Sequence, residues 1–230
     1  MASDESKVPE ETKGDVAHAL AKGAISTVPV LGGLAAEIFG EIVKPPLQKR
    51  TVEWLNGLAE RIKKLEEQGS FRVESLADNE LFVSVVAQAV TIAGRNHQRE
   101  KLDALQNAVV NTAASISIDE NQQMLFLNLL DYLTALHLKI LIYFNDPPAW
   151  FRSQGRPLPS FFGAPPVSGL EEAISELRDR RDLYDSLIAE LYSRGLLNTD
   201  GTGMHTIMST CFDSRTTTLG KGFLRYISST

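Results

Sequence analysis

Apolar residues recur at helical spacing throughout the first half of the chain, and this pattern constrains the fold more than any other feature. In residues 47–70 one side of the expected helix carries Val52, Leu55, Leu58, Ala59, Ile62 and Leu65, and Gly69 is suited to end it. Further helices are expected at 15–26, 30–43, 74–94 and 96–115, and no strand-like alternation precedes residue 115. We therefore predict a mainly α protein whose residues 15–118 form an antiparallel helical bundle.

The run VPVLGGLAAEIFGEIVKPP (residues 28–46) is typical of a helix with one small-residue ridge, formed by Gly32, Ala36 and Gly40. Such ridges let helices approach closely, both in membranes and in soluble bundles. Two apolar stretches, residues 23–36 and 81–94, are each free of charge for 14 residues, whereas a spanning helix needs about 20. Acidic residues at 37 and 41 oppose insertion further. We expect the ridge to face a neighbouring helix, and the chain to have no stable membrane span.

The first 14 residues are acidic and polar, and they lack the basic and apolar regions of a signal peptide. We expect a disordered tail there. The net charge of −6 argues against a general binder of nucleic acids or anionic membranes. Cys211 is the single cysteine, so an intrachain disulfide cannot form, which suits the cytoplasm.

The second half, residues 119–230, has a different character. Two apolar helices are expected on either side of a junction near Leu133–Thr134. Residues 145–169 hold six of the ten prolines together with four aromatic residues, and we expect a long irregular connection there. Helical segments, a glycine-bearing hairpin and a last helix follow, in the order found in winged-helix proteins. The prediction for 119–230 is a winged-helix-like domain with a small β-hairpin.

The segments LTALHLKILIYFND, DLYDSLIAELYSRGLL and TTTLGKGFLRYI carry a family resemblance. They resemble corresponding parts of winged-helix proteins. The whole layout is similar to that of Abi-alpha-type bacterial proteins, which are loosely linked to phage abortive infection. The resemblance covers about 120 residues in pattern and includes no invariant functional motif. It implies a cytosolic bacterial protein with a defence or regulatory role and no known active site.

Motifs of catalysis and of cofactor binding are not found in the sequence. No P-loop, no dinucleotide fingerprint, no HExxH and no CxxC occurs, and GTG at 201–203 is expected to be a hairpin turn. His205 and Cys211 could share a strand face, but no orienting third group accompanies them. His97 lies in a basic cluster that is expected to face water, and His137 is expected to be a buried imidazole. We predict no enzyme activity, no metal, no cofactor and no small-molecule substrate.

Two sets of residues are candidates for contacts with a partner. Trp150, Phe151, Phe161 and Phe162 could anchor a protein, or could clamp the connection onto its neighbours. Arg178, Arg180, Arg181 and Arg215 could contact nucleic acid, on the expected recognition helix and the wing. That helix region holds four arginines against four acidic residues, so phosphate binding is disfavoured.

The function predicted from the sequence is that of a non-enzymatic cytosolic interaction or regulatory protein. It would act through contacts with a protein partner or by self-association, with antiviral defence in bacteria as its setting. Two alternatives stay open. The first is a winged-helix regulator that binds DNA. The second is a conditional membrane-active effector that uses the segment Asp15–Val43.

Overall fold

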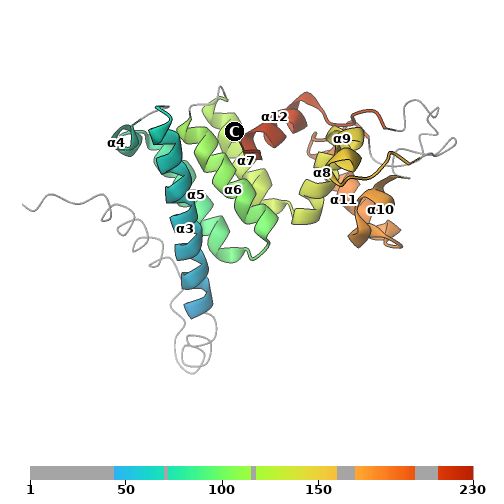
Figure 1. The fold of residues 1–230 in the computed structure, drawn as a ribbon, viewed down its shortest axis with the longest axis horizontal. Coiled ribbons are helices and arrows are strands. Elements are labelled where there is room, and N and C mark those ends of the chain that lie inside the picture. The colour runs from blue at the N-terminus through green and yellow to red at the C-terminus, as the bar shows by residue number, and fades with distance from the viewer. Residues whose placement is uncertain (1–43, 70–71, 115–117, 160–168, 200–211, 230) are drawn as a thin grey trace, which may run out of the picture. The chain divides into compact units, whose positions relative to one another are not determined.

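The structure is a computed structural model, and it describes residues 44–69, 72–114, 118–159, 169–199 and 212–229 (Figure 1). These residues are mainly helical, which confirms the predicted fold class. Regular strands do not occur among them. The acidic tail at 1–14, the helices expected before residue 44 and the ridge of Gly32, Ala36 and Gly40 lie outside the described residues.

The chain divides into two compact units, Met1–Glu120 and Asn121–Thr230. The described helices of the first unit are α3 (Lys44–Glu67), α4 (Val73–Ala77), α5 (Glu80–Arg95) and α6 (Arg99–Ala113). Helices α3, α5 and α6 pack on one another, and α4 lies against α3 and α5 (Figure 1). Their arrangement agrees with the helical bundle expected from the sequence.

Helix α3 begins where two prolines occupy its first turn, at positions that need no backbone donor. It ends at Glu67, and Gly69 follows with a φ of 78°, as expected for a helix stop. Its buried line is shifted from the predicted stripe. Thr51, Trp54 and Leu58 are buried, whereas Val52 and Ala59 are exposed. The large indole of Trp54 takes the centre of the interface, which turns the neighbouring small residues outward.

Helices α3 and α6 run in the same direction, with α5 antiparallel to both. Trp54 Nε1 donates to the carbonyl of Leu102 at 3.0 Å, and Gln106 Nε2 donates to the carbonyl of Trp54 at 2.9 Å. One turn earlier, Arg50 Nη1 donates to the carbonyl of Asn96 at 3.1 Å. The first two bonds fix the register between α3 and α6, and the third ties α3 to the C-cap of α5, because each satisfies a polar group at the edge of an apolar interface.

The turn before α5 follows the short helix α4, which contains Ser75 and ends just before Asp78. The N-cap of α5 is Asn79, whose side chain accepts from the backbone N–H of Phe82 at 3.0 Å. Asparagine is a strong N-cap because its short side chain reaches the free amides of the first turn.

The described elements of the second unit centre on α8 (Ala135–Asn145). They are α7 (Glu120–Tyr132), α9 (Pro147–Ser153), α10 (Leu170–Ala173), the 3₁₀ turn η2 (Ser175–Leu177), α11 (Arg181–Ser193) and α12 (Thr218–Ile227). The junction predicted near Leu133–Thr134 is confirmed, since Thr134 is the N-cap of α8. Helix α8 packs against α9, α10, α11 and α12, and most of its side chains are buried.

Part of the connection expected to be irregular is a helix. Residues 147–153 form α9, capped by Asp146, whose carboxylate accepts from the N–H of Ala149 at 2.8 Å. Pro147 and Pro148 occupy the first helical positions, where proline's fixed φ favours a helix start. The pair of prolines therefore opens a helix here rather than preventing one.

The chain returns toward α8 after α11 and then enters α12. Leu197 and Thr216 form an isolated antiparallel bridge, and the backbone N–H of Arg215 donates to the carbonyl of Phe144 at 2.8 Å. Thr217 caps α12 by accepting from the N–H of Gly220 at 3.0 Å. The predicted hairpin falls largely in residues 200–211, outside the described ranges.

No single helix in the described parts of the chain has both the length and the apolar character needed to cross a bilayer. Helices α7 and α8 meet those criteria only when taken together, and they are bent by 120° at the junction between them. Their largest apolar side chains, among them Phe126 and Tyr143, are fully buried within the second unit.

Candidate interaction surface and pocket

Three of the four arginines predicted to contact nucleic acid gather at the start of α11, and all three are exposed. Arg178 ends η2, Arg180 is the N-cap residue of α11, and Arg181 is its first residue. Between them Asp179 has a φ of 58°, a left-handed conformation that aspartate adopts more readily than most residues. The turn therefore presents arginine and aspartate side by side.

Carboxylates are interspersed with these arginines along α11. Arg181 Nε lies 3.3 Å from Asp185 Oδ2, one helical turn ahead, and Asp182 is exposed beside them. This exposed ion pair adds little to stability, but the carboxylate of Asp185 neutralises the charge of Arg181, the first residue of the helix. The outward-facing residues of α11 are Arg181, Asp182, Ser186, Ala189, Tyr192 and Ser193. Such a mixed face suits a protein surface better than a phosphate backbone.

A stacked tyrosine–arginine pair and a second exposed tyrosine lie where α7 and α11 end. The guanidinium of Arg194 stacks over the ring of Tyr132, 3.6 Å from its centroid. Tyr132 is 51% exposed and Tyr192 is 49% exposed, so both offer ring area to a partner. Tyrosine and arginine are the residue types that contribute most at protein interfaces. We call Tyr132, Tyr192 and Arg194 the α11 patch.

Arg215, the fourth predicted arginine, does not lie at the exposed start of α11 with the other three. Its main chain is bonded on both sides, because its carbonyl also accepts from the N–H of Asn198 at 2.9 Å. Its side chain is half-buried. The position therefore connects the end of α8 to the segment after α11.

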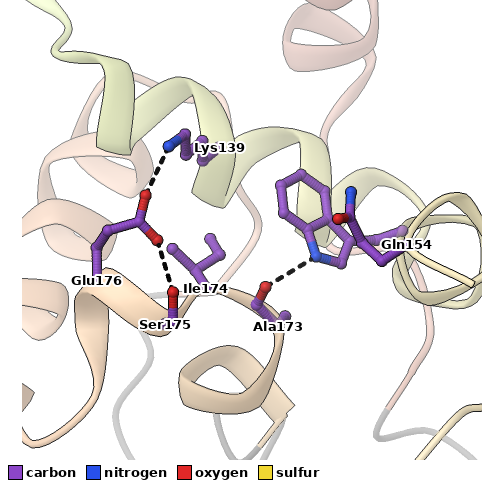
Figure 2. Close-up of a pocket in the computed structure, with 7 residues that line it drawn as sticks. Lys139, Gln154, Ala173, Ile174, Ser175 and Glu176 are labelled. Atoms are coloured by element: carbon purple, nitrogen blue, oxygen red, sulfur yellow. Dashed lines mark hydrogen bonds and ion pairs between the residues drawn. The ribbon is translucent and has the colours of Figure 1, made fainter. Parts of the chain in front are cut away.

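A pocket of about 270 Å³ lies between α8, α9 and the α10–η2 segment (Figure 2). Lys139 Nζ donates to Glu176 Oε1 at 2.7 Å, and Ser175 Oγ donates to Glu176 Oε2 at 3.3 Å. The hydrogen bond from Lys139 is the main cause that holds the pKa of Glu176 below its ordinary value of 4.5. Lys139 and Glu176 therefore form a charged pair at neutral pH on one side of the pocket.

Trp150 and Phe151, two of the predicted partner anchors, belong to the interior and the pocket wall. Trp150 is half-buried, and its Nε1 donates to the carbonyl of Ala173 at 3.1 Å. Phe151 is 1% exposed and packs edge-on against Tyr143 and Phe212. In this state Phe151 offers no surface to a partner. Phe161 and Phe162 lie outside the described residues.

His137 is buried, as expected, and its role is to cap α8. Its Nδ1 accepts from the backbone N–H of Thr134 at 3.1 Å, completing a capping box. Its Nε2 lies 3.5 Å from Glu190 Oε2 on α11. The bond at Nδ1 assigns the proton of the neutral imidazole to Nε2, which then faces the carboxylate.

The remaining candidates add no further site. His97 is exposed in the turn before α6, as expected, and Arg99 beside it lies 4.0 Å from Asp103. No group of three or more His, Cys, Asp or Glu residues in the described part of the chain could hold a metal ion. His205 and Cys211 lie outside that part.

Sequence reasoning missed the pocket and the α11 patch. The residues of the ion pair Lys139–Glu176 are 37 positions apart, and no local pattern links them. Tyr132 and Arg194 are equally remote in sequence and meet only because both helices end at the same place. The sequence offered one signal for the α11 patch, which is that tyrosine and arginine residues stand at the ends of the expected helices.

Comparison of the chain with protein-family models, with curated proteins and with solved structures finds no match in any of the three. The resemblance to Abi-alpha-type proteins therefore rests on the sequence segments alone.

Proposed function

We propose that this chain is a non-enzymatic interaction or regulatory protein that acts through protein–protein contacts. The observation that carries the proposal is the mixed face of α11, where Arg181 is paired with Asp185 and Asp182 stands exposed. Phosphate binding needs unpaired positive charge, which this face lacks along the helix. The α11 patch at the end of the same helix supplies the tyrosine and arginine chemistry of an interface.

The second unit is, in this proposal, a winged-helix-like domain with a small hairpin. Support comes from the order of its elements: α11, a turn at Gly195 with a φ of 71°, an antiparallel bridge between Leu197 and Thr216, and a terminal helix. Helix α11 would then occupy the position of a recognition helix. It would recognise a protein surface, or a second copy of this chain.

The proposed setting is the cytoplasm of a bacterium, in antiviral defence. This part of the proposal rests on the resemblance to Abi-alpha-type proteins and on the single cysteine of the chain. A defence protein of this kind would act by binding, with no reaction of its own.

Affinity capture with matched variants tests the proposed contact. The full chain is used as bait, with Tyr132→Ala/Tyr192→Ala as the test variant and Val83→Ala as the control. Val83 is 48% exposed on α5, in the other unit, so its truncation alters an exposed apolar side chain outside the α11 patch. Binding of the captured protein should weaken at least about tenfold in the test variant, since interface anchors cost more than about 1.4 kcal/mol when truncated.

Sedimentation velocity of the unchanged chain, the test variant and the control variant measures self-association. If the partner is a second copy, the oligomer should dissociate in the test variant and persist in the control. Capture and self-association that are both unchanged by the double substitution would contradict the proposal.

Binding of DNA is the second candidate, and the exposed cluster of Arg178, Arg180 and Arg181 favours it. If this function holds, a duplex should be retained at low salt, and Arg180→Ala should weaken retention. Affinity should also fall steeply as salt rises, because phosphate contacts release counterions. A duplex that is not shifted at low salt would exclude this candidate.

A further inference from the structure

The pocket in the second unit combines two opposite charges with the indole ring of Trp150, and the proposed protein contact uses none of its residues. Lys139 and Glu176 lie together on one side (Figure 2). The indole of Trp150 and the side chain of Ile174 also line the pocket. Trp150 is fixed by its hydrogen bond to the carbonyl of Ala173, whereas Ile174 is 2% exposed and offers almost no surface to a ligand.

The charges in the pocket restrict which ligands can enter. A simple cation attracted to Glu176 would be repelled by Lys139, and a simple anion attracted to Lys139 would be repelled by Glu176. Two further arginines lie near this pair: Arg156 Nη2 lies 3.9 Å from Glu172 and pairs with it, and Arg180 Nη1 donates to the backbone carbonyl of Glu176 at 3.4 Å. A ligand that carries both charges close together can pair its positive group with Glu176 and its negative group with Lys139 at the same time.

The ion pair can open at small cost. The side chain of Lys139 is 27% exposed and that of Glu176 is 49% exposed, so both ends reach solvent. Partly exposed pairs of this kind contribute little to stability, and the long lysine side chain can move without disturbing α8. Two charge-assisted hydrogen bonds to a ligand would offset the bond that is lost.

We propose that this pocket binds a free α-amino acid with an apolar side chain. Its ammonium group would lie on the carboxylate of Glu176, and its carboxylate on the ammonium of Lys139. Its side chain would pack on the ring of Trp150. The amide group of Gln154 and the hydroxyl of Ser175 line the same pocket and can complete the hydrogen bonds of the ligand (Figure 2).

The size of the pocket agrees with this ligand class. A volume of about 270 Å³ is below the range of about 300–1,000 Å³ common for drug-sized ligands. A single amino acid fits that space, whereas a folded partner segment does not.

Nuclear magnetic resonance of the full chain tests the proposal, with L-leucine as the probe. The chain has two tryptophans, and their indole N–H signals report separate places. Trp150 lines the pocket, whereas Trp54 is 4% exposed in the first unit and donates to Leu102. L-Leucine should shift the Trp150 signal in a saturable manner and leave the Trp54 signal unchanged.

Two analogues with the same side chain separate the charges. L-Leucinamide lacks the carboxylate and 4-methylpentanoate lacks the ammonium group, and each should bind at least about tenfold more weakly than L-leucine. Glu176→Gln and Lys139→Met should weaken L-leucine binding similarly. Asp185→Asn, which breaks an ion pair on α11, should leave it unchanged.

Three results would overturn the proposal. They are a Trp150 signal that stays fixed up to about 10 mM L-leucine, an analogue that binds as tightly as L-leucine, and binding that survives both pocket substitutions. A result of this kind would leave the protein-contact function untouched, because the α11 patch is tested with other residues.

Discussion

Single residues show how tightly the second unit is packed, and Gly220 is the clearest case. A Cβ atom at Gly220 would collide with the backbone carbonyl oxygen of Leu196 and crowd the methyl group of Thr216. Gly222, two residues further along α12, has only the ring of Phe126 nearby, at 3.4 Å. Substitution by alanine should therefore affect the stability of the protein differently at these two glycines.

Gly220→Ala should destabilise the protein by about 1–3 kcal/mol, because the backbone of Leu196 cannot move aside as a side chain could. Gly222→Ala is the matched control, and it should be neutral or stabilise by up to about 1 kcal/mol through the higher helix propensity of alanine. Urea unfolding monitored by circular dichroism measures both. Equal effects of the two substitutions would contradict the close approach of α12 to Leu196.

Glu176 provides a prediction about pH. Its pKa lies below the ordinary value of 4.5 in the folded protein, chiefly through the hydrogen bond from Lys139. The stability that this bond supplies is therefore complete above pH 4.5 and is lost as the pH falls through the lower folded value. In Lys139→Met the pKa of Glu176 should rise toward the ordinary value, as followed by NMR titration of its carboxyl carbon. Superimposable titrations of Glu176 in the unchanged chain and in Lys139→Met would refute the pairing of Lys139 with Glu176.

At the scale of elements, the sequence predicted helices well and their details less well. The junction at Leu133–Thr134 and the stop at Gly69 were predictable, because threonine caps and glycine stops act through local backbone geometry. The buried line of α3 was not, since the position of Trp54 depends on α6. Helix α9 was not predicted, because the high proline content of residues 145–169 indicated an irregular connection throughout.

The candidate site was less predictable than the helices. The arginines before α11 were visible in the sequence, and they are exposed in the structure. The burial of Phe151 could not be foreseen, because it depends on the fold of α9 against Tyr143 of α8 and on the ring of Phe212, which comes from a distant segment. The pairing of Lys139 with Glu176 depends in the same way on the packing of α8 against the segment that holds α10 and η2.

The start of α12 gives an element-scale prediction. Thr217 Oγ1 accepts from the N–H of Gly220 and donates to the carbonyl of Gly195 at 2.6 Å, so one hydroxyl caps α12 and ties it to the end of α11. Thr217→Ala should cost about 1–2 kcal/mol of stability, the upper part of the range for N-caps.

Thermal unfolding of Thr217→Ser provides the control, because serine keeps the hydroxyl and should retain most of the stability. A serine variant as unstable as the alanine variant would mean that the methyl group of Thr217, rather than its hydroxyl, matters.

At the scale of the whole molecule, the chain consists of a helical first unit and a second unit that carries both candidate sites. The α11 patch and the pocket use different residues, so a protein contact and a small ligand can be tested separately. The net charge of −6 agrees with a protein partner rather than a nucleic acid.

Site-specific photo-cross-linking in cells tests the central claim most directly. A benzophenone amino acid replaces Tyr192 on the α11 patch, or Val83 on α5 as the control; both positions are about half exposed. The account predicts that irradiation joins the Tyr192 position to a protein, which is a partner or a second copy of the chain, and gives no such product at Val83. Cross-linking of the Tyr192 position to DNA, or no protein product beyond that of the control, would contradict it.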